Sequence, residues 1–125
     1  ASGSDVKLYV STFYQEGGNA EFDAAFKEWI NSDSTNLTNN NGNDMIAAVS
    51  VMGYDAYYVA LEALKAAGST NPADVMTALW DVTYDGITGH IAFDDENGDA
   101  VRDLAYVKHC NTETGAWDLV GEQGV

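Results

Sequence analysis

The sequence predicts a mixed α/β domain with a β-hairpin near its C-terminus. Two observations carry this prediction. A short β-rich segment, residues 7–13, comes before stretches with the apolar spacing of helices. Farther along, residues 84–100 contain a turn, a strand with alternating apolar side chains, and an Asn-Gly pair of the kind that closes tight hairpins. Helices between a strand and a hairpin are typical of α/β folds.

The first expected strand covers residues 7–13, whose β-branched and aromatic side chains suit a strand that is at least half buried. Gly17 and Gly18 end this strand, and Asn19 supplies a helix N-cap. Over residues 20–32 the apolar side chains recur at helical spacing, which predicts an amphipathic helix with one broad apolar stripe. The stripe consists of Phe22, Ala25, Phe26, Trp29 and Ile30.

A polar loop and a long helix are expected next. Residues 33–44 are rich in Asn, which predicts a mobile loop. Residues 45–67 are apolar on nearly every side, so we expect a helix that is buried on most faces, between a sheet and other elements. Gly53 predicts a break or a close packing point in this helix. Gly68 ends it, because glycine accepts the left-handed conformation past the last turn.

A third helix and two strands complete the pattern. The Asn-Pro pair at 71–72 supplies an N-cap and a preorganised first helical residue. The next strand carries alternating Ile91 and Phe93. The Asn-Gly pair at 97–98 then turns the chain back into a second strand at residues 104–109.

We interpret residues 1–125 as a single fragment, with a flexible lead-in at residues 1–5 and a flexible tail at residues 121–125. A short last strand at residues 117–120 is expected before that tail. One strand and a hairpin make a thin sheet for this many apolar helices, so we expect neighbouring strands to lie outside this chain. The exposed sheet edge then favours a homodimer.

Composition narrows the classes of function. Acidic residues outnumber basic ones 20 to 5, and the net charge of −15 argues against a nucleic-acid or anionic-membrane partner. Cys110 is the single cysteine, so it forms no internal disulfide, and we interpret it as a strand residue. The sequence shows no apolar run of the roughly 18 residues that span a bilayer. It shows no secretion signal either, which decides nothing about its compartment.

Candidate metal and catalytic motifs fail on spacing. The acids at 94–99 suggest a calcium loop, but Ala100 and Tyr106 stand where such a loop needs Gly and a bidentate Glu. His90 and His109 have neither metal-ligand nor catalytic spacing. We therefore predict no metal, no cofactor and no enzymatic activity.

An acidic flavodoxin-like electron carrier is an alternative from a different class. Residues 12–19 follow a strand and precede a helix, where anion-binding loops lie. Glu16 would repel the phosphate of FMN at this point, and the loop is poor in the hydroxyl groups that cradle phosphate. We therefore expect this chain not to bind a nucleotide.

Two segments resemble the type I periplasmic solute-binding proteins, the leucine/isoleucine/valine-binding protein family that serves ABC importers. Residues 53–70, GYDAYYVALEALKAAGST, are similar to the family pattern A-Y-D-A-V-x-x-L-A-x-A-L-x-x-A-G-S-T. Residues 84–99, YDGITGHIAFDDENGD, resemble the hairpin signature F-D-G-V-T-G-x-I-x-F-D-x-x-G-D. A weaker third block at residues 7–30 extends the resemblance over nearly the whole chain after residue 5.

The resemblance implies one part of a two-lobed receptor, namely the C-terminal part of its second, three-layer α/β/α lobe. It implies non-catalytic capture of a branched-chain or related amino acid by lobe closure. The implied partner is an ABC permease, and the implied location of the full-length protein is extracytoplasmic, in the periplasm or as a surface lipoprotein. The segments that hold the zwitterion are absent here, so we expect this chain alone to bind amino acids negligibly.

The ligand-binding residues that the resemblance implies in this chain are Tyr14, Val51 and Tyr54. Tyr14 follows the first strand, and the other two lie near the start of the long helix, where free N–H groups favour an anionic ligand. The ligand-binding module of a receptor or regulator with this fold stays open as an alternative, as does a stand-alone α/β interaction domain.

Overall fold

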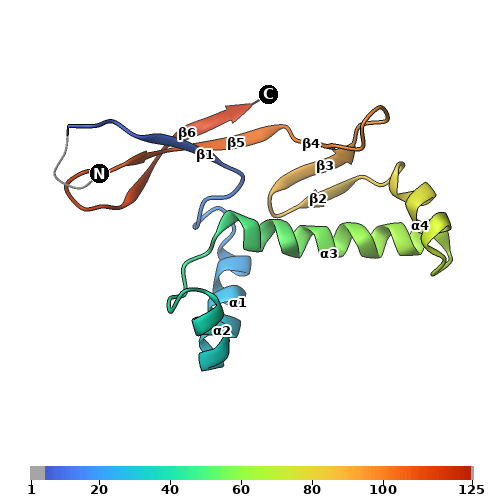
Figure 1. Ribbon diagram of the computed structural model, residues 1–125, viewed down its shortest axis with the longest axis horizontal. Helices are drawn as coiled ribbons and strands as arrows, with labels where there is room; N and C mark the ends of the chain where they lie inside the picture. The colour runs from blue at the N-terminus through green and yellow to red at the C-terminus, as the bar shows by residue number, and fades with distance from the viewer. Residues whose placement is uncertain (1–4, 125) are drawn as a thin grey trace.

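The computed structural model describes residues 5–124, which form four helices and six strands (Figure 1). The mixed α/β class is confirmed. The predicted lead-in lies outside the described residues except for Asp5, which has no regular structure. In chain order the elements are β1 (Tyr9–Thr12), α1 (Ala20–Asn31), α2 (Ser34–Asn39), α3 (Ala48–Ala67), α4 (Pro72–Leu79), β2 (Tyr84–Gly86), β3 (Gly89–Phe93), β4 (Ala100–Val101), β5 (Leu104–Cys110) and β6 (Trp117–Gly124).

The strands form two separate antiparallel sheets. One has the order β1-β5-β6, and the other has the order β2-β3-β4. We call the first the outer sheet, because it extends away from the helices on one side of the molecule (Figure 1). Residues 14–101, which hold all four helices and the second sheet, are called the helical body.

Helix boundaries follow local capping chemistry, as the sequence predicts. The side chain of Asn19 accepts a hydrogen bond from the N–H of Phe22 at the start of α1. Asn71 caps α4 in the same way, with Pro72 in the first turn. α3 ends at Gly68, whose φ of +58° lies in the left-handed region.

α3 is buried along one stripe only, so the prediction of a helix buried on most faces is wrong. Its partners within the described residues lie on one side, and the opposite side, including Tyr57, is exposed. Gly53 does not interrupt the helix, and no atom of another element within residues 5–124 lies within 4 Å of a Cβ placed there. The buried residues recur at every fourth position and are Val51, Asp55, Val59 and Ala63.

The segment predicted as a loop, residues 33–44, contains α2, so this prediction is wrong in part. Asp33 caps the helix by accepting a hydrogen bond from the N–H of Thr35 at 2.6 Å. The Asn36 side chain donates to the carbonyl of Trp29 and ties α2 back to α1. Capping and one tertiary bond therefore stabilise a short helix whose Ser, Thr and Asn content is equally suited to a loop.

The strand pairing also differs from the predicted hairpin. β3 pairs with the short β4, in the register Phe93 to Ala100, and β5 instead pairs with β1 and β6. The Asn-Gly turn is present, and Gly98 has a φ of +77°. Since β4 ends after two residues, the chain leaves that sheet before β5 begins.

Two expectations about the outer sheet are also wrong. β1 is mostly exposed, not half buried, because Tyr9 and Val10, which point to opposite faces of the sheet, are 54% and 37% exposed. The tail predicted to be flexible is part of β6, since residues 121–124 pair with residues 104–107 of β5. The predicted last strand is confirmed and is longer than expected. Val125 lies outside the described residues.

Buried apolar side chains form two clusters, both in the helical body. The first joins α3 to the strand β3 and contains Val59, Ala63, Val82 and Ile91. The second joins α1, α3 and the segment after β1, and contains Tyr14, Phe22 and Val51. Neither cluster includes a residue of the outer sheet.

Candidate functional site

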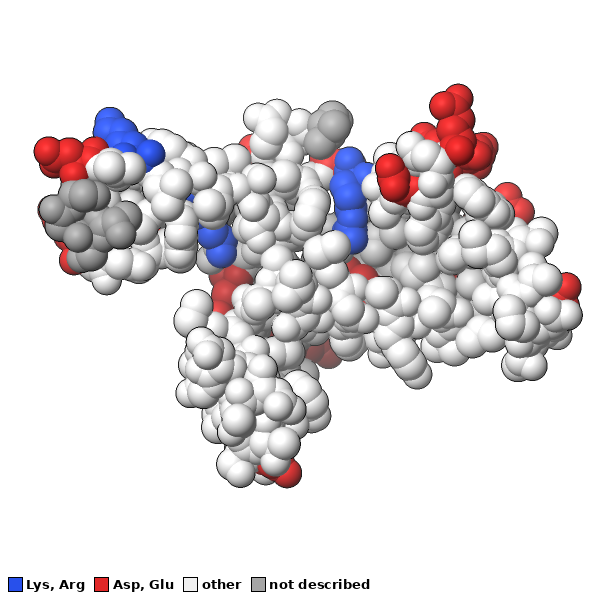
Figure 2. Space-filling view, in the orientation of Figure 1, with Lys and Arg blue, Asp and Glu red and all other residues white. Residues whose placement is uncertain are grey.

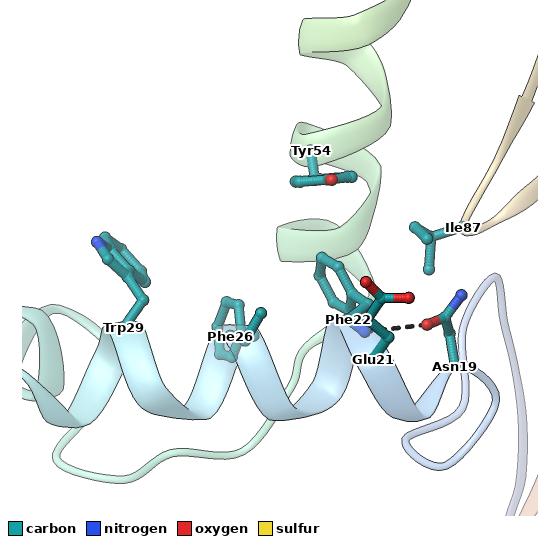
Figure 3. A pocket seen from close by; sticks show the side chains of 8 residues that line it. Asn19, Glu21, Phe22, Phe26, Trp29, Tyr54 and Ile87 are labelled. Atoms are coloured by element: carbon teal, nitrogen blue, oxygen red, sulfur yellow. Dashed lines mark hydrogen bonds between the residues drawn. The ribbon is translucent and has the colours of Figure 1, made fainter.

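A hollow of about 470 Å³ lies where α1, α3 and the β2–β3 turn meet (Figure 3). The apolar stripe predicted for α1, except Ile30, lines one side of it, and Tyr54 reaches toward this side from α3. Ile87 closes it from the turn between β2 and β3. The lining residues are Asn19, Glu21, Phe22, Ala25, Phe26, Trp29, Tyr54 and Ile87.

Aromatic rings form a continuous wall of the hollow. The ring of Tyr54 meets Phe22 edge-on, with centroids 5.1 Å apart. Phe26 follows at 6.0 Å from Phe22, and Trp29 at 6.0 Å from Phe26. Edge-to-face and tilted contacts at these distances are favourable aromatic geometries. The wall therefore offers a rigid apolar surface to a hydrocarbon group.

Tyr54 remains a neutral phenol at physiological pH. Its hydroxyl donates a hydrogen bond to the hydroxyl of Tyr58 at 3.4 Å. This bond, followed by partial burial, raises the pKa of Tyr54 to about 12. The hydroxyl thus adds a polar point to the aromatic wall without adding a charge.

The rim of the hollow is acidic. Glu21 lies at the first turn of α1, and the side-chain oxygen of Asn19 is already engaged in capping that helix. No basic side chain is among the residues that line the hollow. Lys27, on the same helix, is paired with Glu16. The charge therefore suits an ammonium group and does not suit a carboxylate.

The three predicted site residues come close together, but only one faces the hollow. Tyr54 is 41% exposed, whereas Tyr14 is 3% and Val51 is 0% exposed. Tyr14 and Val51 pack with Phe22 directly behind the aromatic wall. In this conformation they can support the wall, and Tyr54 can contact a ligand.

Tyr14 is held by the buried carboxylate of Asp23, a contact that the sequence did not predict. Its hydroxyl donates to Asp23 at 2.5 Å, and the other oxygen of Asp23 accepts the N–H of Gly17 at 2.6 Å. Burial, then the bond to Asp23, raises the pKa of Tyr14. These bonds fix the segment between β1 and α1.

Asp55 is a second buried acid that the sequence analysis missed. It is 0% exposed, and its carboxylate accepts hydrogen bonds from the backbone N–H groups of Ile87 and Thr88, at 2.9 and 2.8 Å. The Thr88 hydroxyl donates to it at 2.6 Å. Asp55 thus fixes Ile87 against the hollow. An acid on the apolar stripe of this helix was the available signal, since a buried carboxylate needs donors.

Other residues singled out in the sequence lie away from the hollow. His90 is paired with Asp85 on the adjacent strand, with Nδ1 2.6 Å from Oδ1. The ring of His109 lies beside Tyr9 in the outer sheet, and Cys110 is a buried strand residue with a free thiol. The acids at residues 94–99, which do not fit a calcium loop, lie on the β3–β4 turn, where Figure 2 shows acids gathered.

Residues 5–124 hold no group of three or more His, Cys, Asp or Glu side chains placed to bind a metal. Within the same range, no helix has the length and apolar character to cross a membrane.

Comparison with known proteins gives a consistent match. The family model described as periplasmic binding protein matches residues 6–114. The chain is 32% identical over 124 residues to the metabotropic glutamate receptor-like protein E of Dictyostelium discoideum, over 94% of this chain. The crystal structure of a leucine-binding protein, LivK, from Thermotoga maritima is similar with a TM-score of 0.65 and 26% identity, also over 94% of this chain.

The similarity covers only a small part of these relatives. The chain spans 15% of the Dictyostelium protein and 31% of the leucine-binding protein chain.

Proposed function

Because this chain belongs to the periplasmic binding protein family, we propose that it forms part of an extracytoplasmic receptor that captures an amino acid for an ABC importer. Similarity to a leucine-binding protein over 94% of the chain is the observation that carries this proposal. A branched-chain or related amino acid is the proposed ligand, held by lobe closure without catalysis, and an ABC permease is the proposed partner. The family match argues against the flavodoxin-like alternative.

The hollow supports the apolar part of this proposal. Its aromatic wall suits the hydrocarbon side chain of leucine, isoleucine or valine, and Glu21 suits an ammonium group. Since no cation lines the hollow, the ligand carboxylate must be held by groups elsewhere in the receptor. We assign Tyr54 as a ligand contact, with Tyr14 and Val51 as the residues that hold its wall in place.

Calorimetric titration of leucine tests the proposal. The longest natural protein that contains this chain should bind leucine, and the 125-residue chain alone should bind it negligibly. In the longer protein, Tyr54→Ala should weaken binding by about ten-fold, the size expected for loss of one aromatic contact. Tyr57→Ala is the matched control, because Tyr57 lies on the same helix outside the hollow.

Two outcomes would contradict parts of the proposal. Submillimolar leucine binding by the chain alone would show that the groups for the zwitterion are present here. Equal effects of Tyr54→Ala and Tyr57→Ala would remove the hollow from the ligand site.

A receptor module is a second candidate function. The 32% identity to a receptor-like protein favours it. Glutamate competition separates the two candidates, since an importer component for branched-chain amino acids should prefer leucine. The acidic rim argues against a ligand with a second carboxylate. Preference for glutamate would support the receptor module.

We also propose a homodimer through the outer sheet. Among the described residues, the outer edges of β1 and β6 pair with no further strand. Unpaired edges invite pairing with another backbone. Light scattering should show a dimer of this chain, and a monomer at high concentration would contradict it.

A further inference from the structure

Asp55 anchors a chain of polar contacts that continues beyond the hollow. Its carboxylate has no exposed surface, and its oxygens are met by two N–H groups and one hydroxyl of the β2–β3 turn. The turn lies so close that a Cβ on Gly86 would come within 2.6 Å of the carboxylate. α3 and the turn are therefore locked together at this point.

The Thr88 hydroxyl, which bonds to Asp55, also bonds to a cation. While it donates to Asp55, it accepts a hydrogen bond from Nη1 of Arg102 at 2.5 Å. The same nitrogen lies 3.3 Å from the Thr88 carbonyl oxygen. A buried acid and a half-buried guanidinium thus share one hydroxyl, an arrangement in which each bond strengthens the other.

Arg102 lies where the chain passes between the helical body and the outer sheet. The described chain makes this passage twice, once between β1 and α1 and once between β4 and β5. Arg102 belongs to the second passage, and its guanidinium carbon lies 5.6 Å from the centre of the Phe13 ring in the first. One guanidinium therefore contacts both passages and the turn that Asp55 holds.

We propose that Asp55, Thr88 and Arg102 are positioning residues that set the angle between the helical body and the outer sheet. If the proposed function is correct, this angle also sets how far the receptor opens around its ligand. The two apolar clusters contain no residue of the outer sheet, so packing there does not fix the angle. The three polar residues act across the passages instead.

A distance measurement in the longest natural protein that contains this chain tests the inference. Spin labels at Asp74→Cys in α4 and Glu122→Cys in β6, both exposed, report the angle. Thr88→Val removes the shared hydroxyl, and Arg102→Gln removes the charge. Both should shift or broaden the distance distribution. Because Cys110 is a native free cysteine, the extent to which the spin label reacts with it is first measured in the protein without added cysteines.

Two variants serve as controls. Thr88→Ser keeps the hydroxyl and should retain the wild-type distribution. Lys108→Gln removes a cation from β5 outside this network and should also leave the distances unchanged. The unfolding midpoint of every variant is recorded, because a purely structural network would move the midpoint and leave the distances as they are.

The distance measurement and the leucine titration can fail independently, so the inference and the proposed function are tested separately. If the spin-label distances in both Thr88→Val and Arg102→Gln are those of the wild-type protein, the inference is overturned. If Thr88→Val does not fold, Arg102→Gln decides alone, because Arg102 is only half buried. Leucine titration of the same variants should show a loss of about two- to thirty-fold, the range for residues that act through a coupling network. If the wild-type protein binds no leucine, the proposed function fails, and the distances still decide the inference.

Discussion

Buried apolar side chains gather in two clusters within the helical body, whereas the described residues of the outer sheet bury only Cys110. The body is held by packing between α1, α3, α4 and the second sheet. The outer sheet is held by the backbone hydrogen bonds of its ladders, with Tyr9, Leu119 and Val120 exposed. An antiparallel sheet usually covers at least one face with a core. The difference indicates that packing within the body carries most of the stability of this chain, and that the proposed partner would find an uncovered outer sheet.

The largest expected effect comes from the carboxylate that locks the body. Asp55→Ala leaves two N–H groups and the Thr88 hydroxyl without their acceptor, which should lower the free energy of unfolding by about 3–5 kcal/mol. Urea unfolding of the chain measures this. Asp85→Ala is the control, because this exposed acid makes a surface pair with His90 and should change stability by about 1 kcal/mol or less. Equal losses would refute the locking role.

Two glycines give opposite predictions within the body. Gly86→Ala forces a Cβ to within 2.6 Å of the Asp55 carboxylate, so it should destabilise the chain by about 1–3 kcal/mol. Gly53→Ala meets no atom within 4 Å inside α3, so it should stabilise the chain by about 0.5–1 kcal/mol. Thermal unfolding of both variants measures the sign. A stable Gly86→Ala variant would show that the turn is looser than described.

The same substitution in each region tests the comparison directly. Val59→Ala removes two methyl groups from the first cluster and should lower the free energy of unfolding by about 1.6 kcal/mol, at about 0.8 per buried carbon. Val120→Ala, on the exposed β6 strand, should change it by about 0.5 kcal/mol or less. A larger loss at Val120 would mean that a partner covers the outer sheet even in the isolated chain.

The smallest expected effect concerns pH. Because the folded protein raises the pKa of Tyr54 to about 12, the stabilisation is complete below the unfolded pKa near 10 and is lost as pH rises through 12. In a pH titration followed by phenolate absorbance, Tyr54 should ionise at a higher pH than an ordinary tyrosine. In Tyr58→Phe it should ionise at a lower pH than in the wild type, because the acceptor of the Tyr54 hydroxyl is gone. Tyr57→Phe should leave that transition unchanged.

Local chemistry explains which parts of the fold could be predicted from the sequence. Helix ends at Asn19, Gly68 and Asn71 depend on residues within one turn, and all three predictions are confirmed. The sequence did not predict α2, because its Ser, Thr and Asn content also suits a loop. The Asp33 cap and the Asn36 hydrogen bond that stabilise the helix are seen only in the structure.

Long-range pairing explains what could not be predicted. The sequence shows that residues 104–109 form a strand, but not that β5 pairs with β1 across most of the chain. Likewise, the apolar pattern of α3 does not reveal which of its faces this chain covers.

The candidate site divides in the same way. The apolar stripe of α1 is read from helical spacing, and Tyr54 is implied by the family resemblance; the structure brings them to one hollow. The locking role of Asp55 depends on Thr88, which is 33 residues away. Only the three-dimensional structure shows this contact, although an acid in an apolar helix signals that a donor must lie nearby.

Native-state hydrogen exchange of the chain tests the central comparison most directly. We expect amides of α3 around Val59 and Ala63 to exchange only through global unfolding, and amides of β5 and β6 to exchange through an opening of much lower free energy. Equal protection of the outer sheet and α3 would contradict this expectation, because the outer sheet would then be as stably held as the body.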